Sequence, residues 1–213
     1  MQQILVYADS LSWGIIPNTR QRLPFDQRWP GVMELALSTH ENRVRVIEDC
    51  LNGRRTVWDD PYKAGRNGLI GLAQRIEINS PLDMVILMLG SNDFQSVHNY
   101  NVWHSAQGIA SLIQAIRSAP LEPGMPVPPI LVIAPPTIGL AKANMTEKFA
   151  GAIEKCAGMV AAYQSICANS SCFFFDANSI INTSNIDGVH LDADAHLVLG
   201  HALAKLIPEL LNR

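Results

Sequence analysis

Five short runs of apolar, β-branched or aromatic residues recur along the chain and predict the strands of a sheet. Most of them are apolar on both faces, which is typical of parallel strands buried between two layers of helices. The runs are Ile4–Ala8, Val44–Ile47, Met84–Leu89, Ile130–Ala134 and Cys172–Phe175.

Apolar residues at helical spacing fill the segments between these runs. The segments are Val32–Leu37, Leu69–Ile78, Ile109–Ile116, Thr146–Ala168 and Ala193–Leu211. Strands that alternate with helices imply a parallel sheet with right-handed crossovers. We therefore predict an α/β fold of three αβα layers, flavodoxin-like, with a five-stranded parallel sheet in the order 2-1-3-4-5.

Two of the predicted helices carry signals at their ends. Thr146, followed by Glu147, is the candidate for an imperfect capping box at the start of the long fourth helix. Asp192 or Asp194 should cap the last helix. Pro208 should kink that helix or end it early.

Length and composition narrow the class of protein. The 213 residues suit one domain, 1–213, that is large enough to bury a core. A net charge of -3 gives no basic footprint for nucleic acid or for an anionic membrane. No apolar stretch reaches the roughly 18 residues of a membrane span, and no signal peptide pattern opens the chain, so we expect a cytoplasmic protein.

Cysteine and histidine spacing gives no sign of a metal site. The four cysteines lack Cys-x-x-Cys spacing, and we interpret them as buried thiols, with a Cys167–Cys172 disulfide as the alternative. The histidines lack carboxylates or cysteines at the spacing of metal ligands. Neither a metal nor any other cofactor is expected.

Ser10 follows the first predicted strand directly and opens the turn Asp9–Gly14. Open α/β sheets place their chemistry at the carboxyl ends of their strands, which is where this hydroxyl would lie. A serine nucleophile needs a base that takes its proton and an acid that orients the base. Ser10 is therefore a candidate nucleophile.

Asp187 and His190, after the last predicted strand, can supply the acid and the base. They are three residues apart, so a single turn could bring the carboxylate to one imidazole nitrogen while the other faces Ser10. Asp192 and Asp194 are rival orienting acids, although both are better placed to cap the last helix.

Donors for a tetrahedral oxyanion could come from three strand ends. They are the backbone N–H of Ser10, a backbone N–H in the Asn52–Gly53 turn and the side-chain amide of Asn92. Each has a plainer interpretation, because Asn52–Gly53 is an ordinary turn dipeptide and Asn92–Asp93 could cap a helix.

Four of these segments, at four strand ends, resemble the serine, glycine, asparagine and histidine blocks of the GDSL or SGNH hydrolases. The blocks correspond to Ser10, Gly53, Asn92 and His190. The resemblance runs the length of the chain and is closest to the bacterial arylesterase and acyltransferase branch, which shares patterns such as Arg55–Thr56. One departure is Ala8, where the family has a glycine; it would strain the turn if that position needed a positive φ.

The resemblance implies roles for individual residues. Ser10, Asp187 and His190 would form the catalytic triad, and Ser10, Gly53 and Asn92 the oxyanion hole. Leu11, Phe94 and Val189 would flank the acyl pocket, with ordinary apolar wall residues as the alternative.

These residues predict a serine esterase that hydrolyses small, short-chain alkyl or aryl carboxylic esters through a Ser10 acyl-enzyme, with acyl transfer to an alcohol as a further outcome. A carbohydrate O-acetyl esterase, a thioesterase or a lysophospholipase of the same family is the alternative. A flavodoxin-like module that binds an anion at a helix N-terminus is the non-enzyme alternative, and it leaves Asn92 and His190 unexplained.

The expected partner is a small-molecule ester, with no nucleic acid and no membrane. The long connection Ile15–Arg28, the four tryptophans and the habit of the arylesterase branch together predict a homo-oligomer. The same tryptophans could instead line a pocket.

Overall fold

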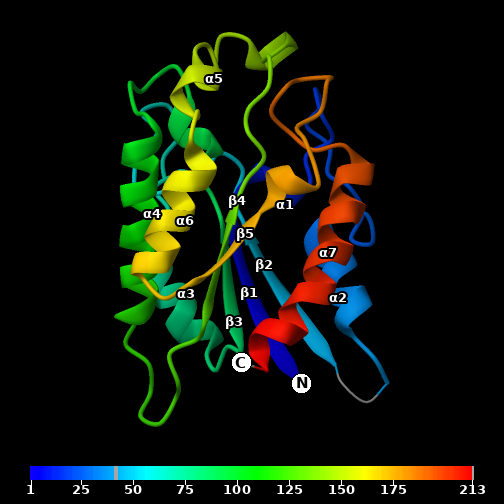
Figure 1. Cartoon of the computed structure of the whole chain (residues 1–213), viewed down its shortest axis with the longest axis vertical. Coiled ribbons are helices and arrows are strands. Elements are labelled where there is room, and N and C mark those ends of the chain that lie inside the picture. Colours follow the sequence, from blue (N-terminus) through cyan, green and yellow to red (C-terminus); the bar gives the residue numbers. More distant parts are fainter. Residues whose placement is uncertain (41–42, 213) are drawn as a thin grey trace.

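The computed structural model describes residues 1–40 and 43–212, arranged around one five-stranded parallel sheet (Figure 1). The strands lie in the order β2-β1-β3-β4-β5, which confirms the predicted fold class. They are β1 (Gln2–Ala8), β2 (Val44–Cys50), β3 (Met84–Met88), β4 (Ile130–Ala134) and β5 (Phe173–Asp176). Each predicted apolar run overlaps one of them.

The register of β1 with its two neighbours makes three strands end level. Ala8, the last residue of β1, pairs with Cys50 of β2 on one side and with Met88 of β3 on the other. Whatever follows these strands therefore starts from the same edge of the sheet. This edge is the one where parallel sheets carry their binding and catalytic groups.

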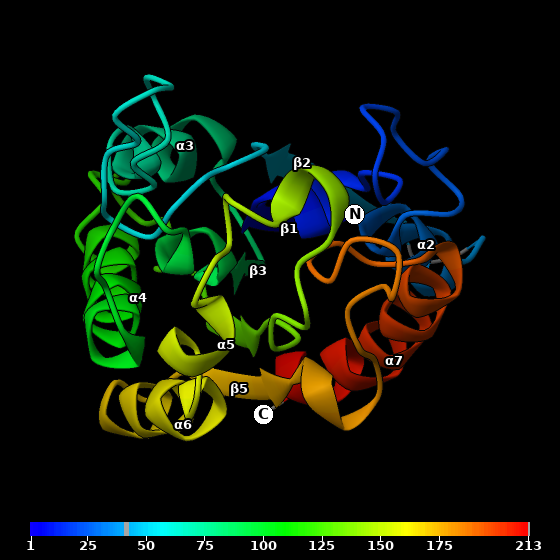
Figure 2. The same ribbon diagram turned by 90° about the horizontal axis from the view of Figure 1, so that it is seen from above.

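Helices cover both faces of the sheet, as Figures 1 and 2 show. On one face lie α2 (Trp29–Leu37) and α7 (Ala193–Leu211). On the other lie α3 (Leu72–Asn79), α4 (Val102–Arg117) and α6 (Met159–Asn169). Side chains alternate along β1, so that Ile4 and Val6 join the core under α2 and α7 while Leu5 and Tyr7 join the core under α3, α4 and α6.

The prediction of one long helix over Thr146–Ala168 is wrong. The segment contains α5 (Ala152–Lys155) and α6, and each begins after a glycine in the left-handed conformation, Gly151 with φ 73 and Gly158 with φ 83. Thr146 ends the 3₁₀ turn η2 (Ala143–Met145) instead of opening a helix, so the capping box is also wrong. Apolar residues keep a helical spacing across both glycines, so the sequence pattern does not reveal that the backbone leaves the helix at these two positions.

The ends of α7 agree with the prediction only in part. Asp192 is the N-cap residue, but its carboxylate accepts a hydrogen bond from the Ser184 hydroxyl (2.7 Å) and makes no capping bond. The helix continues past Pro208 to Leu211, so the proline does not end it early.

All four cysteines are free thiols, and Cys50, Cys156 and Cys167 are buried. The alternative of a Cys167–Cys172 disulfide is therefore wrong. In the part of the chain that the structure describes, no helix combines the length and the apolar character needed to cross a membrane.

Candidate active site

Loops from four strand ends meet at the carboxyl edge of the sheet and line one small cavity of about 80 Å³. Ser10 follows β1, Gly53 follows β2, Asn92 follows β3 and His190 follows β5, and all four line this cavity. The winding of the sheet thus brings together residues that lie far apart in the sequence. We call this space the catalytic cavity.

Asp187 and His190 are joined by a short hydrogen bond. The Asp187 Oδ2 atom lies 2.7 Å from His190 Nδ1, and both side chains are buried. The rival acids Asp192 and Asp194 make no hydrogen bond to this ring, and Asp192 is engaged by Ser184 instead. Of the three candidate acids, Asp187 therefore has the geometry that an orienting acid needs.

Four donors surround the Asp187 carboxylate. Besides the His190 ring, it accepts the backbone N–H groups of Val189 (2.9 Å), His190 (2.9 Å) and Asn18 (3.2 Å). Burial by itself raises the pKa of Asp187, but the hydrogen bonds from the His190 side chain and from the His190 and Val189 backbone outweigh it and hold the pKa well below its ordinary value. The carboxylate stays charged next to the imidazole. The Asn18 contact also shows that the long connection after Ser10 folds back onto this acid.

Ser10 is the first residue of the short helix α1 (Ser10–Trp13). The Asp9 carboxylate caps this helix by accepting the Leu11 N–H at 2.9 Å. Ser10 is 5% exposed, and within the described chain its hydroxyl has no hydrogen-bond partner, so it is not bonded to His190 here. Bonds between nucleophile and base are often long until substrate binds.

Ala8 causes no strain where the related family has glycine. It is the last residue of β1 and keeps the extended conformation of the strand. Among residues 1–40 and 43–212, the non-glycine residues with positive φ are Asn18, Ala143 and Ser171. The extra methyl group packs into the core below α2 and α7.

Asn92 is held on both sides of its amide group. Its Nδ2 donates to Asp9 Oδ2 (2.9 Å) and to the carbonyl of Arg54 (3.1 Å), and its Oδ1 accepts from Gln95 Nε2 (2.7 Å). Both amide hydrogens are thus engaged in this structure. An oxyanion donor role requires Asn92 to share or exchange one of these bonds.

The loop that carries Asn92 is fixed from below by a buried arginine. Arg55 is fully buried and donates to the Asn92 carbonyl (2.6 Å), to Gln95 Oε1 (2.8 Å) and to Asp60 Oδ2 (3.1 Å). These three hydrogen bonds hold the long Arg55 side chain in one conformation, so that its planar guanidinium group is a rigid support for the loop. The family resemblance marked Arg55–Thr56 as a pattern, but nothing in the sequence assigned it these partners.

Asp93 supports the same loop from the other side. Its carboxylate accepts the Thr56 N–H (2.9 Å), the Thr56 hydroxyl (2.7 Å) and the Ser105 hydroxyl (2.7 Å). Asn92 and Asp93 belong to the 3₁₀ turn η1 (Ser91–Phe94), and the cap of α4 is Asn101. The interpretation of Asn92–Asp93 as a helix cap is therefore wrong.

Gly53 lies in the turn after β2 with φ 82, a left-handed conformation that favours glycine. A Cβ atom there would meet nothing closer than Arg66, at 3.9 Å. Backbone conformation, and not crowding, is thus what requires a glycine. Within the described chain, the N–H groups of Gly53 and Ser10 have no backbone or side-chain acceptor, as oxyanion donors need.

The three residues expected around an acyl pocket are buried in the core. Leu11, Phe94 and Val189 are at most 2% exposed, and none of them lines the catalytic cavity, so their place beside an acyl group stays a prediction. The apolar lining of the catalytic cavity comes from other loops. Its members are Ile15, Met145 and Phe149. Sequence spacing gave no signal for these residues, because they come from irregular connections.

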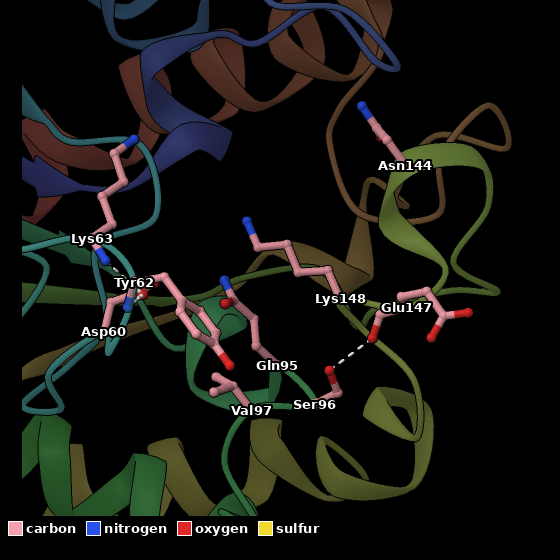
Figure 3. Close-up of a pocket in the computed structure, with 9 residues that line it drawn as sticks. All are labelled: Asp60, Tyr62, Lys63, Gln95, Ser96, Val97, Asn144, Glu147 and Lys148. Carbon is pink, nitrogen blue, oxygen red and sulfur yellow. Dashed lines mark hydrogen bonds between the residues drawn. The ribbon is translucent and has the colours of Figure 1, made fainter.

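A second and larger cavity of about 520 Å³ adjoins the catalytic cavity (Figure 3). Four residues line both spaces: Asp60, Lys63, Asn144 and Lys148. None of the four tryptophans lines either cavity. Among residues 1–40 and 43–212, no group of three or more histidine, cysteine, aspartate or glutamate side chains is arranged to hold a metal ion.

The arrangement carries the groups that acyl transfer requires. A hydroxyl, an imidazole bound to a charged carboxylate, and backbone N–H groups surround one cavity. The roles of Ser10, Asp187, His190, Gly53 and Asn92 stay predictions.

Comparison with known proteins agrees with this geometry. Residues 9–198 match the GDSL-like Lipase/Acylhydrolase family. An arylesterase from Vibrio mimicus is 33% identical over 92 residues, which are 43% of this chain and 38% of that relative. The match thus spans well under half of the relative's length.

Two solved structures are similar over almost the whole chain. A carbohydrate acetylesterase from Sinorhizobium meliloti has a TM-score of 0.93 and 33% identity, covering 99% of this chain and 100% of its own. An inhibitor-bound aryl esterase from M. smegmatis has a TM-score of 0.93 and 30% identity, with the same coverage of 99% and 100%.

Proposed function

The chain belongs to the GDSL-like lipase/acylhydrolase family and is a GDSL-type esterase, and on that premise we propose that it hydrolyses small, short-chain alkyl or aryl carboxylic esters through an acyl-enzyme on Ser10. The observation that carries the proposal is the catalytic cavity, which Ser10 and His190 both line while Asp187 holds the ring. Membership of an enzyme family also overturns the alternative of an anion-binding module.

In the first half of the proposed reaction, Ser10 Oγ attacks the ester carbonyl carbon and its proton passes to His190 Nε2. Asp187 holds the opposite ring nitrogen and stabilises the imidazolium that forms. The N–H groups of Ser10 and Gly53 and the amide of Asn92 receive the negative oxygen. When the tetrahedral intermediate collapses, the alcohol or phenol leaves with the proton from His190.

In the second half, water gives a proton to His190 and its oxygen attacks the acyl carbon. Collapse of this second intermediate releases the carboxylic acid and returns the proton to Ser10. An alcohol in place of water would give a new ester by the same steps, so acyl transfer needs no further group.

The size of the catalytic cavity favours a short acyl group. Its volume of about 80 Å³ is small beside the roughly 300 to 1,000 Å³ of ordinary ligand pockets. A few heavy atoms fill it. The alcohol portion of the ester then extends into the adjoining cavity of about 520 Å³.

A carbohydrate acetylester is the second candidate substrate. Polar side chains of Gln95, Ser96 and Asn144 line the adjoining cavity, which suits a sugar. A similar structure is that of a carbohydrate acetylesterase. Turnover of an acetylated sugar against 4-nitrophenyl acetate, compared as kcat/KM, separates the two candidates.

Covalent labelling tests the proposed nucleophile. A fluorophosphonate probe should modify Ser10, as peptide mapping by mass spectrometry would show, and the Ser10→Ala protein should not be labelled. Ser91→Ala is a matched control, because the Ser91 hydroxyl is buried in a neighbouring loop without a hydrogen-bond partner. Label on another serine, or unchanged labelling of Ser10→Ala, contradicts the proposal.

We also propose that the chain forms a homo-oligomer. Trp103, on α4, supports this proposal, because it is 60% exposed and aromatic side chains are enriched at protein interfaces. Light scattering decides the point, and a monomer of 23.4 kDa overturns it.

A further inference from the structure

Three cationic residues are among those that line the catalytic cavity: Arg20, Lys63 and Lys148. They come from three separate segments, namely the connection after α1, the loop between β2 and α3, and the segment that follows η2. In the described part of the chain, none of them takes part in an ion pair. We call these three residues the cationic rim.

The acids nearest to the rim form no ion pair with it in the described part of the chain. Asp60 is bound by the buried Arg55 (3.1 Å) and by the backbone N–H groups of Tyr62 (2.9 Å) and Lys63 (3.1 Å). Glu147 turns its carboxylate away from Lys148, as Figure 3 shows, while its carbonyl accepts the Ser96 hydroxyl. The positive charge of the rim is therefore free to meet a ligand.

The lysines of the rim are accessible, yet they are less well hydrated than ordinary surface lysines. Partial removal from water lowers the pKa of Lys63, and the positive charges of Arg66 and Arg20 lower it further. The pKa of Lys148 is also lowered, first by desolvation, and then by Arg55, Lys63 and Arg20 against the opposing effect of Asp60. A bound anion would relieve this repulsion.

Position decides which part of an ester would carry that anion. Lys63 and Lys148 line both cavities, whereas the catalytic cavity has room only for a short acyl group. Figure 3 shows Lys148 extending into the space between Lys63 and Asn144. An anionic group next to these ammonium groups belongs to the alcohol portion, outside the catalytic cavity.

We propose that this esterase acts on esters whose alcohol portion carries an ionised acid group, a carboxylate or a phosphate, which Lys63 and Lys148 bind while the ester lies at Ser10. The inference rests on the proposed function. The two lysines offer point charges that fit oxygen anions of either kind, and Arg20 adds positive charge from the side of the catalytic cavity.

Matched substrates test the inference directly. The acetate ester of 4-hydroxybenzoate is compared with that of 4-hydroxybenzamide, and 4-acetoxyphenyl phosphate forms a second arm that separates phosphate from carboxylate. At low salt, wild type should hydrolyse at least one of the anionic esters with a higher kcat/KM than the neutral benzamide ester. The ratio of anionic to neutral kcat/KM should fall toward one in about 0.5 M salt, because salt screens exposed charges.

Removing one rim charge should reduce this preference. Lys63→Gln and Lys148→Gln should each lower the ratio of anionic to neutral kcat/KM about fivefold, as loss of a single partly exposed charge implies. Lys205→Gln is the matched control, because Lys205 is an exposed lysine of α7 and lines neither cavity. Its ratio should equal that of wild type.

Several outcomes overturn the inference. One is a wild-type ratio of one or less in both arms, and another is a ratio that Lys63→Gln and Lys148→Gln leave unchanged. Preference for an anion only on the acyl side, tested with mono-4-nitrophenyl adipate against 4-nitrophenyl hexanoate, contradicts the placement on the alcohol.

A binding measurement separates failure of this inference from failure of the proposed function. If wild type hydrolyses none of the esters, the proposed function is wrong. Calorimetric binding of 4-hydroxybenzoate against 4-hydroxybenzamide to wild type and Lys148→Gln then still decides whether the rim binds an anion.

Discussion

Asp9 and Asp187 are both buried next to the proposed catalytic residues, the first directly before Ser10 and the second three residues before His190. Their pKa values are nevertheless shifted in opposite directions from the ordinary value of an aspartate. Burial raises the pKa of Asp9 to about 6, although hydrogen bonds from Leu11 and Asn92 and the charges of nearby groups oppose it. The pKa of Asp187 lies below its ordinary value.

The number and kind of donors explains the difference. Asp9 accepts two hydrogen bonds, from the Leu11 N–H and from the Asn92 amide. Asp187 accepts four, one of them from the ring of His190. Desolvation raises the pKa of both carboxylates, and only at Asp187 do the donors outweigh it. Two acids of one site can thus take separate tasks, as environments that push pKa values apart allow.

The largest effect is expected where the charged acid is replaced. Asp187→Asn keeps the shape of the side chain but removes the charge that orients His190, and it should lower kcat about 10⁴-fold. Steady-state kinetics with 4-nitrophenyl acetate measures this. Asp192→Asn is the matched control, because Asp192 bonds to Ser184 and not to His190, and its kcat should stay within about twofold of wild type. A loss of kcat below tenfold for Asp187→Asn would mean that the Asp187 carboxylate, like that of Asp192, does not orient His190.

A smaller loss of kcat is expected when Asn92, which donates a hydrogen bond to Asp9, is replaced. Asn92→Ala removes the proposed donor for the oxyanion and also one of the two hydrogen bonds to Asp9. We expect kcat to fall about 10²- to 10³-fold with little change in KM, since the donor acts mainly in the transition state. A change confined to KM would show that Asn92 serves binding instead.

The contributions of Asp9 and Asp187 to the free energy of unfolding should change with pH in opposite directions. Folded Asp9 keeps a proton that the unfolded chain has released, so its contribution to the free energy of unfolding falls by about 2 to 3 kcal/mol as pH rises from the ordinary value of 3.8 to about 6. The contribution of Asp187 is fully present above about pH 4 and is lost as pH falls below it, because its folded pKa is depressed.

Urea unfolding of wild type, Asp9→Asn and Asp187→Asn between pH 3 and 7.5 measures both contributions. The difference between wild type and Asp9→Asn should decline from pH 4 to 6, while the difference between wild type and Asp187→Asn should decline in acid. Parallel curves for the two variants would contradict the comparison.

The smallest effect concerns a strand end that touches neither acid. Gly53→Ala should lower the free energy of unfolding by about 1 to 2 kcal/mol, because alanine disfavours the left-handed backbone that Gly53 adopts. Gly65→Ala is the matched control, with φ 73 and open space around its Cβ position. Similar losses of stability, with loss of activity only in Gly53→Ala, are expected. Equal activities would remove Gly53 from the oxyanion hole.

Much of the fold could be predicted because its strands are apolar on both faces. β3 and β4 are buried along their full length, and such runs are visible in the sequence without any partner. The handedness of crossovers then leaves few topologies. Candidate site residues could be found for the same reason, since Ser10 and Asn92 closely follow such runs.

Other features escaped because they depend on partners distant in the sequence. Arg55 is fully buried beneath Asn92, 37 residues away, and an isolated arginine in the sequence is normally expected on the surface. Phe94 and Val189 lie in the core although they flank residues of the site. Phe149, in the apolar wall of the catalytic cavity, comes from a segment that was expected to be one helix, and Met145 lies directly before that segment.

Local pattern was enough to define the strands, the direction in which they wind and the side chains at their ends, because hydrophobic periodicity and turn preferences act between residues a few positions apart. Tertiary structure selected Asp187 over its neighbours, shifted the pKa values of Asp9 and Asp187 in opposite directions, and left the cationic rim without an ion pair among the described residues. These properties depend on every donor, charge and void within a few ångströms, and only the packed chain brings those groups together.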